Sequence, residues 1–167
     1  NDKIELVDPG HRIPKEYEFD IPIVFEDDYL AIVNKPSGLT VSGNKFETLE
    51  NALVNKVTLS SQPDAWKWAK PVHRLDSATS GLILFSKTAS VHTKLAKLFE
   101  EKQIEKTYVA LLTGKQEEDS IIDSPINNQE AVSELKVMKV IPSLRNEFLT
   151  LVKFLPKTGR THQLRIH

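Results

Sequence analysis

The stretch with the clearest chemical potential in this 167-residue chain runs from Pro71 to Gly81 and reads Pro-Val-His-Arg-Leu-Asp-Ser-Ala-Thr-Ser-Gly. It is polar, it places Asp76 two residues after Arg74, and it leads directly into an apolar run. A carboxylate at the mouth of a buried strand can have its pKa raised by desolvation, or a nearby cation can hold it ionised. A structural interpretation is also open, in which Asp76 or Thr79 only caps the loop.

A second candidate stretch, from Lys157 to His167, combines basic and polar residues. Its alternation predicts a strand from Arg160 to Ile166, with Gln163 and Arg165 on a polar face. An arginine that lines a cleft needs a carboxylate or a phosphate as its partner. The alternative is a strand whose polar face meets solvent. In a third stretch Tyr108 opens a β-rich run, where packing alone would explain an aromatic residue.

Other catalytic chemistries fit these residues poorly. Ser80 lacks the first glycine of the G-x-S-x-G elbow that hydrolases use. The spacing of His162 and His167 matches no zinc motif. The order His73-Arg74-Leu75-Asp76 differs from the kinase catalytic loop, and no glycine-rich phosphate loop is present. A glycosidase would need a second carboxylate opposite Asp76, so a chemistry that uses one carboxylate fits better.

The composition restricts the class of protein. Hydrophobic residues make up 40% of the chain and charged residues 27%, as in globular proteins. No apolar run approaches the roughly 18 residues of a membrane span, and residues 1–20 lack the apolar block of a signal peptide. The absence of cysteine excludes disulfide scaffolds, thiol catalysis and cysteine-ligated zinc. We therefore expect a cytoplasmic protein without a membrane partner.

The formal net charge of −1 conceals two basic segments. Residues 66–106 hold eight basic and four acidic side chains, and residues 153–167 hold four basic and no acidic ones. Residues 1–30, in contrast, hold three basic and nine acidic side chains. If the fold brings the basic segments together, a nearly neutral protein presents a positive face to nucleic acid. Lysines scattered over the surface are the alternative.

The order of the predicted elements favours an α+β fold with a largely antiparallel sheet, because most strands follow one another without an intervening helix. Two helices are expected, with Thr48 and Thr88 as their N-caps. Pro142 is expected to join the last hairpin, and the apolar run Gly81–Phe85 to be a fully buried strand. The seven predicted strands are Ile23–Phe25, Tyr29–Val33, Gly81–Phe85, Tyr108–Leu112, Leu135–Ile141, Phe148–Leu155 and Arg160–Ile166.

Four segments, taken in order, resemble the motifs of the RluA-type pseudouridine synthases. The hairpin Val24–Pro36 resembles that family's opening motif, and His73–Gly81 is similar to its central signature. Lys106–Ala110 resembles its tyrosine motif, and Gly159–His167 its last core motif. The resemblance extends over residues 20–167.

The resemblance implies an enzyme that isomerises uridine in RNA to pseudouridine with neither cofactor nor metal. It implies an α+β fold with a bent, mainly antiparallel mixed sheet, flanking helices and a central catalytic cleft. By motif position Asp76 would be the catalytic aspartate, Tyr108 the active-site tyrosine and Arg165 the basic partner of Asp76. Members often carry an RNA-binding S4 domain in front. We therefore interpret residues 1–19 as a linker or the tail of such a domain, and residues 20–167 as a catalytic domain. We expect the fold to be truncated at both ends.

Pseudouridine formation moves a uracil from its N1 to its C5 without adding or removing atoms, so one carboxylate acting as nucleophile or base can suffice. A uridine in a helix must first be flipped out, and Arg74 is the candidate to fill the gap. The expected substrate is structured RNA, with ribosomal RNA favoured over transfer RNA, and no obligate protein partner is implied. The alternatives are a non-catalytic RNA-binding module and a carbohydrate-active enzyme. Further RNA contacts are predicted for His73, Lys94, Lys97, Lys102, Lys157 and Arg160.

Overall fold

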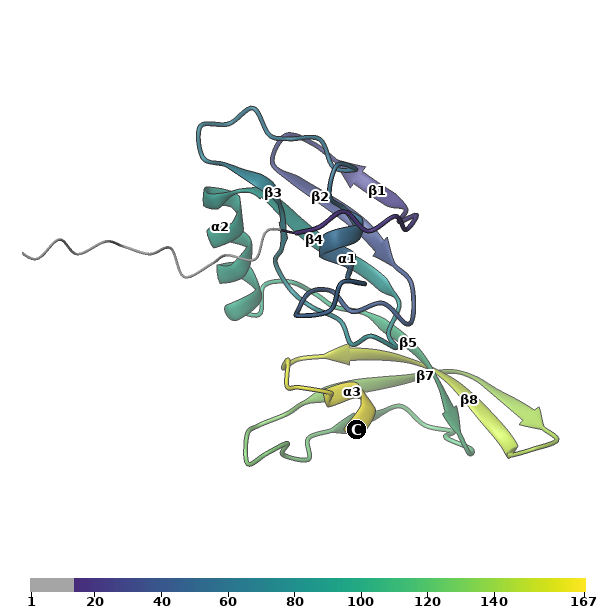
Figure 1. The fold of residues 1–167 in the computed structure, drawn as a ribbon. Coiled ribbons are helices and arrows are strands. Elements are labelled where there is room, and N and C mark those ends of the chain that lie inside the picture. The colour runs from purple at the N-terminus through teal and green to yellow at the C-terminus, as the bar shows by residue number, and fades with distance from the viewer. Residues whose placement is uncertain (1–13) are drawn as a thin grey trace, which may run out of the picture. The chain divides into compact units, whose positions relative to one another are not determined.

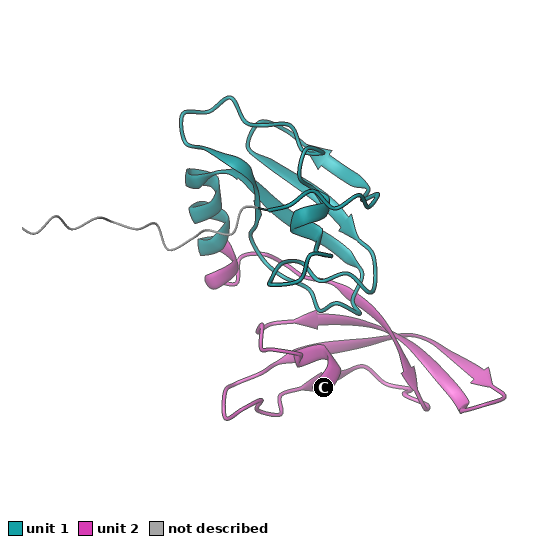
Figure 2. Ribbon diagram, viewed as in Figure 1, with its two compact units in different colours: residues 1–97 teal, residues 98–167 magenta. Residues whose placement is uncertain are grey.

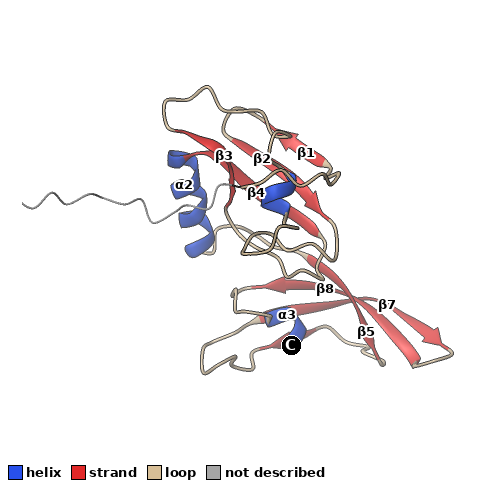
Figure 3. Ribbon diagram, in the orientation of Figure 1, coloured by secondary structure: helices blue, strands red, loops and turns tan. Residues whose placement is uncertain are grey.

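The computed structural model describes residues 14–167, which form two compact units. The first unit ends at Lys97 and the second runs from Leu98 to His167 (Figure 2). Eight strands and three helices lie within the described residues (Figures 1 and 3). Each unit contains its own four-stranded sheet. The predicted α+β class is therefore confirmed.

The first unit is built on an antiparallel sheet with the strand order β1-β2-β4-β3. Residues that pair directly across two strands lie on the same face of a sheet. Ala31 pairs with Phe85 and Val33 with Ile83, and all four side chains are fully buried on one face. These apolar pairs form the centre of the core of this unit. Its strands are β1 (Ile23–Glu26), β2 (Leu30–Lys35), β3 (Ala65–Pro71) and β4 (Gly81–Thr88).

Two helices pack against this sheet, and both have the predicted N-caps. The side chain of Thr48 accepts a hydrogen bond from an amide in the first turn of α1 (Leu49–Ala52), and α1 packs into the core beside Phe85. The side chain of Thr88 does the same for α2 (Ala89–Glu100). Neighbouring residues of a strand point to opposite faces. Because Ser86 lies within 2.8 Å of His92 of α2, the two helices contact opposite faces of the sheet.

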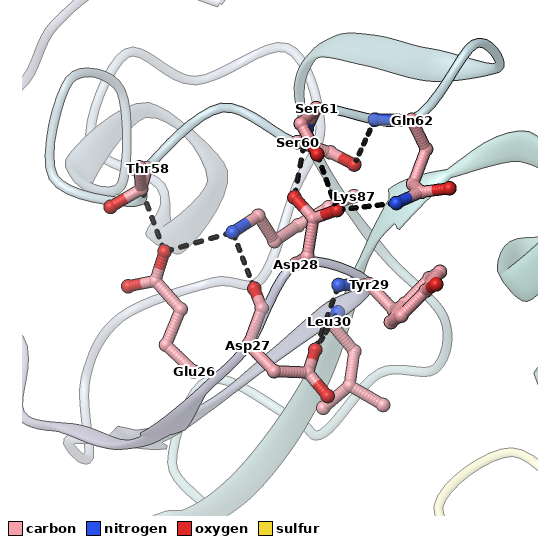
Figure 4. Close-up of polar contacts among 10 residues, drawn as sticks. All are labelled: Glu26, Asp27, Asp28, Tyr29, Leu30, Thr58, Ser60, Ser61, Gln62 and Lys87. Atoms are coloured by element: carbon pink, nitrogen blue, oxygen red, sulfur yellow. Dashed lines mark hydrogen bonds and ion pairs between the residues drawn. The ribbon is translucent and has the colours of Figure 1, made fainter.

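The acidic turn between β1 and β2 fastens a distant loop to the sheet (Figure 4). Asp28 accepts hydrogen bonds from the side chain of Gln62 and from the amide and hydroxyl of Ser61. These bonds, the one from Gln62 first, lower the pKa of Asp28 from 3.8 to about 2. Glu26 forms an ion pair of 3.1 Å with Lys87, a buried residue near the end of β4. The turn therefore serves the structure of the first unit.

The described part of the lead-in to the fold packs against α1. The amide of Tyr17 donates a hydrogen bond of 3.2 Å to the carbonyl of Asn51, and the rings of Tyr17 and Phe19 stack at 5.6 Å. Both aromatic residues lie against the core of the first unit. Residues 1–13 lie outside the described part of the chain. A linker or a preceding S4-like domain at residues 1–19 stays a prediction.

The second unit contains an antiparallel sheet with the strand order β5-β8-β7-β6. Leu135, Val152 and Phe154 form its buried core, and Leu164 of the last helix packs against them. The long hairpin of β7 and β8 dominates this unit (Figure 1). Its elements are β5 (Tyr108–Thr113), β6 (Ser120–Ile122), β7 (Ser133–Ser143), β8 (Glu147–Pro156) and α3 (Gln163–Ile166).

Two sequence predictions about strands are wrong, and two strands were not predicted. Strands β3 and β6 were not predicted, because β3 is an edge strand with an irregular register and β6 has only three residues. Leu82 is 55% exposed, so the run Gly81–Phe85 buries one face rather than both. Pro142 lies inside β7, where it pairs with Phe148, and the hairpin turn follows at residues 144–146.

Two further predictions need correction. The segment Arg160–Ile166 is not a strand, because it forms a turn followed by α3 (Figure 3). The strand pairs of both sheets in residues 14–167 are all antiparallel, so the sheet is not mixed. Lys102, one of the predicted RNA-binding residues, follows the end of α2 at Glu100.

Candidate active site

The loop that carries Asp76 joins β3 to β4, and its first residues are tied to β4. The amide of Val72 donates a hydrogen bond of 2.9 Å to the carbonyl of Leu84. The amide of Leu84 in turn donates to Nε2 of His73 at 3.1 Å. The His73 ring therefore adds one hydrogen bond to β4 just beyond the end of β3. This structural use of one ring nitrogen was not predicted, and RNA contact by His73 stays a prediction.

The turn at Asp76 is held by the segment that follows β2. The amide of Thr79 donates to the carbonyl of Asp76 at 3.0 Å, which closes the turn. The amide of Gly38 donates to the carbonyl of Ser77 at 2.7 Å. The hydroxyl of Ser37 donates to the next carbonyl, that of residue 78, at 2.8 Å. These bonds fix the backbone on both sides of Asp76, whose side chain is half-buried.

Two glycines make this arrangement possible. Gly38 has a φ of +93° and Gly81 a φ of +137°, which are backbone conformations that other residues rarely adopt. Gly38 turns the chain so that its amide reaches the loop. Gly81 turns the loop into β4 beside Leu75, whose side chain packs against the core. No role was predicted for Gly38 from the sequence.

Arg165 lies on α3, and this helical turn is held by a buried glutamine. The Gln163 side chain accepts hydrogen bonds from the Thr158 hydroxyl at 2.7 Å and from the Arg160 amide at 2.9 Å. It donates to the carbonyl of Val132 at 3.0 Å and to the hydroxyl of Ser133 at 2.9 Å. These four bonds satisfy a polar side chain that is only 4% exposed. They explain why the segment turns into a helix instead of continuing as a strand.

Tyr108 and the helix of Arg165 share the core of the second unit. Tyr108 opens β5, pairs with Phe154 and is half-buried against the core that also holds Leu164. Arg165 follows Leu164 in sequence and is exposed. The fold thus brings two predicted active-site residues, 57 positions apart in sequence, onto elements that pack on one core. The proximity of Asp76 to Arg165 stays a prediction.

The predicted RNA-binding residues differ in their surroundings. Lys157 forms an ion pair of 3.2 Å with Glu134, and Arg160 donates through Nε to the carbonyl of Glu130 at 2.7 Å. Hydrogen bonds from Lys136 and then from Lys157 lower the pKa of Glu134. Phosphate would therefore compete with protein partners at Lys157 and Arg160. Arg74, Lys94, Lys97 and Lys102 are exposed.

One buried charge lies beside the Asp76 turn and was not predicted from the sequence. Lys35 ends β2, is fully buried, and donates from Nζ to the carbonyl of Ser77 at 3.1 Å. The sequence contains a signal for it, because Ala31, Val33 and Lys35 alternate at every second position of one strand. The first two point into the core, so the third must do the same.

Neither a membrane-spanning helix nor a metal cluster is found in residues 14–167. None of the helices there is long and apolar enough to cross a membrane. No three His, Asp or Glu side chains in that range lie together as a group that could hold a metal ion.

Comparison with known proteins adds a family match. Residues 29–167 match the family described as RNA pseudouridylate synthase. The chain is 36% identical over 159 residues to the ribosomal large subunit pseudouridine synthase D of Nitrosomonas europaea. This alignment covers 88% of this chain and 45% of that protein. It is 35% identical over 171 residues to the ribosomal large subunit pseudouridine synthase C of Pasteurella multocida, covering 93% of this chain and 50% of that one. The chain thus spans about half the length of these relatives.

The fold also resembles a solved structure. The human RNA Pseudouridylate Synthase Domain Containing 1 aligns with a TM-score of 0.72 at 22% identity. The alignment covers 89% of this chain and 64% of the human one. At this identity the likeness concerns the fold, and it agrees with the predicted architecture.

Proposed function

This chain belongs to the RNA pseudouridylate synthase family, and from that membership we propose that it converts uridine in RNA to pseudouridine with Asp76 as the catalytic carboxylate. The family resemblance predicted from the four sequence motifs is confirmed. The observation that carries the proposal is the match over residues 29–167, which includes the Asp76 turn, β5 and α3. The half-buried position of Asp76 in a loop with a fixed backbone supports the assignment.

The proposed reaction is an isomerisation that needs one carboxylate. The bond between N1 of uracil and C1′ of ribose breaks, the same uracil turns, and a bond forms between C5 and C1′. The proton on C5 is lost and N1 regains one, so atoms and electrons balance within the substrate. Asp76 starts ionised and acts as nucleophile or base. A fixed backbone around Asp76 supports this role, because it reduces the number of geometries the carboxylate can adopt.

Tyr108 and Arg165 are proposed to complete the site. The ring of Tyr108 offers a face on which uracil can stack, and its hydroxyl offers a relay for the C5 proton. Arg165 supplies a guanidinium that would pair with the Asp76 carboxylate and favour its ionised form. The hydrogen bonds of Gln163 support the role of Arg165, since they fix the helix that presents it.

Structured ribosomal RNA is the proposed substrate, and the cytoplasm the proposed location. Support for ribosomal RNA as the substrate comes from the names of the relatives, which are ribosomal large subunit pseudouridine synthases. Arg74 is proposed to fill the gap that a flipped uridine leaves. Lys94, Lys97 and Lys102 would bind phosphates without reading sequence, so raising the salt concentration should weaken RNA binding. Pseudouridine maps of total RNA from cells with and without the gene would separate ribosomal from transfer RNA targets.

Replacement of Asp76 by Asn tests the catalytic assignment. The amide keeps the shape of the side chain and removes the charge and the basicity, so we expect pseudouridine formation to fall to background while RNA binding remains. Tritium release from C5-labelled uridine measures the turnover. Asp123→Asn changes an exposed carboxylate of the second unit and should leave turnover unchanged. Near-normal turnover by Asp76→Asn would refute the assignment. If the wild-type protein binds RNA without turnover, it is a non-catalytic module.

A further inference from the structure

Strand β3 carries a tryptophan and a lysine that the proposed reaction does not use. The ammonium nitrogen of Lys70 lies 3.5 Å from the centroid of the Trp66 ring. A cation is attracted by the electron-rich face of an aromatic ring, and tryptophan attracts cations more strongly than tyrosine or phenylalanine. The ring therefore holds the ammonium in one place. Because the ring has no net charge, it leaves the positive charge of Lys70 uncancelled.

Contacts with β4 and α2 fix the Trp66 ring on the side of the sheet that α2 covers. The ring meets the imidazole of His92 edge to face, with a centroid distance of 6.4 Å and an interplanar angle of 88°. Nδ1 of His92 lies 2.8 Å from the Ser86 hydroxyl, which donates to the carbonyl of Lys70 at 3.3 Å. Both the backbone and the side chain of Lys70 are thus held. Such a lysine loses less conformational entropy on binding a ligand than a mobile surface lysine does.

The indole of Trp66 carries an energetic cost. Its Nε1 atom is buried and has no hydrogen-bond partner within residues 14–167. A buried donor without a partner destabilises a protein. Phenylalanine would supply an apolar ring without this cost, but its face attracts a cation less strongly. The indole is therefore better explained by its contact with Lys70 than by packing alone.

The surface around Lys70 is rich in positive charge. Residues 65–99 contain six basic side chains and a single acidic one, that of Asp76. Lys94 and Lys97 are exposed on α2, which lies beside β3 (Figure 1). No carboxylate of the described residues forms an ion pair with Lys70. Charge complementarity therefore favours a polyanion as the ligand of this surface.

We propose that Lys70, held on the ring of Trp66, binds a phosphate of the RNA that flanks the target uridine. Lys70 is the penultimate residue of β3 and precedes Asp76 by six positions, so β3 leads from this lysine into the catalytic loop. A phosphate contact fixes the position of the RNA and reads no sequence. The inference rests on the proposed function, since it assumes that the polyanion is the RNA substrate.

A second lysine over an aromatic ring provides a matched control. The ammonium of Lys115 lies 5.5 Å from the centroid of the Phe148 ring and forms an ion pair of 2.7 Å with Glu117. A carboxylate thus cancels the charge of Lys115, whereas the charge of Lys70 is uncancelled. Replacement of either lysine by Met removes one formal positive charge and one contact between a cation and a ring. A difference between the two variants therefore reports on the uncancelled charge.

The experiment measures the affinity of the full-length protein for a stem-loop RNA of mixed sequence over a range of salt concentrations. For Lys70→Met we expect Kd at low salt to rise about two- to fivefold, as for loss of an ion pair near the surface. The slope of the logarithm of affinity against the logarithm of salt concentration should become shallower by about 0.7–0.9, because one phosphate contact no longer releases a counterion. Lys70→Arg should retain the wild-type affinity and slope. Lys115→Met should change neither.

Variants of Trp66 test whether the ring positions the charge. Trp66→Phe keeps a ring face for Lys70, so RNA affinity should stay near that of wild type. Trp66→Leu removes the ring, and RNA affinity should fall although every charge is retained. The losses from Trp66→Leu and Lys70→Met should not add in the double variant, because both act on one contact. Each variant is assayed below its own Tm, and the Lys70 variants decide the test if Trp66→Leu does not fold.

The outcomes separate this inference from the proposed function. If the wild-type protein binds the stem-loop and Lys70→Met binds it with the same affinity and salt slope, the phosphate contact of Lys70 is wrong and the proposed function stands. Equal losses for Lys70→Met and Lys115→Met would reveal a general effect of net charge and would overturn the inference as well. If the wild-type protein does not bind RNA, the proposed function fails and the role of Lys70 fails with it.

Discussion

The hydrogen bonds of Gln163 allow a quantitative prediction about the second unit. Gln163→Leu keeps the approximate volume and removes all four bonds of a side chain that is 4% exposed. Each bond contributes about 1 kcal/mol net, and a buried group left without a partner costs about 1–3 kcal/mol. Ser133, Thr158 and Val132 keep other hydrogen bonds, so the full cost of four orphaned partners does not apply. We expect a destabilisation of about 3 kcal/mol.

Scanning calorimetry measures this change. For a chain of this size, 1 kcal/mol corresponds to a shift in Tm of about 2–4 °C, so a decrease of roughly 6–12 °C is expected. Gln116→Leu is the matched control, because Gln116 makes one exposed side-chain bond, of 2.8 Å, to the carbonyl of Glu118. Its effect should stay within about 0.5 kcal/mol. Equal Tm values for the two variants would show that the network around Gln163 does not stabilise the unit.

Gln163→Glu tests in which direction the stability of the second unit changes with pH. The carbonyl of Val132 and the burial of the site both disfavour a charged carboxyl there, so its pKa in the folded state should lie above the unfolded value of about 4.3. A group with a raised pKa stabilises the fold below its unfolded pKa and loses that contribution as pH rises through the folded pKa. The deficit in stability relative to wild type should therefore be small near pH 4 and grow toward pH 8. A deficit that is constant with pH would contradict this account.

Three shorter predictions concern the first unit. Hydrogen bonds lower the pKa of Asp28 to about 2, so its stabilising contribution is present above pH 4 and disappears as pH falls toward 2. Asp28→Asn should remove that part of the pH dependence of unfolding. The Cβ that Gly38→Ala adds meets no atom within 4 Å, so its cost in the free energy of unfolding is that of a strained backbone, about 1–3 kcal/mol by urea denaturation. A change below about 0.3 kcal/mol would argue against strain. Arg74→Ala should reduce turnover on a uridine in a duplex more than on a uridine in a loop, and equal losses would count against its role in base flipping.

The sequence predicted the elements whose signals are local. The acidic turn between two β-rich runs specified the first hairpin, and Thr48 and Thr88 specified two helix starts, because N-caps act within one turn of a helix. The residues that carry the family resemblance were found for the same reason, since each motif is a short contiguous segment. The class of the fold followed from the order of those elements.

The errors arose where tertiary contacts override local pattern. Alternation between Arg160 and Ile166 is as regular as in a strand, yet Gln163 finds four partners on other segments and the chain turns into α3. Strand β3 was missed because its pairing with β4 is irregular between Ala65 and Lys70. The buried ammonium of Lys35 donates to the carbonyl of Ser77, 42 residues away. No pattern along the chain encodes that contact, although the alternation of β2 indicates that Lys35 points inward.

Strand β7 protects the open side of its sheet against association with other chains. Beyond Leu135 its partner among the described strands is β8 alone, and the amide of Val137 donates to the Asp119 carboxylate at 2.7 Å instead of to a strand. An open edge of this kind invites aggregation by strand addition unless charge, proline or irregularity interrupts it. Here Lys136 and Lys139 are exposed, the register is irregular between Val137 and Lys139, and Pro142 has no amide hydrogen to offer. These features lower the tendency of this edge to pair with a strand of another chain.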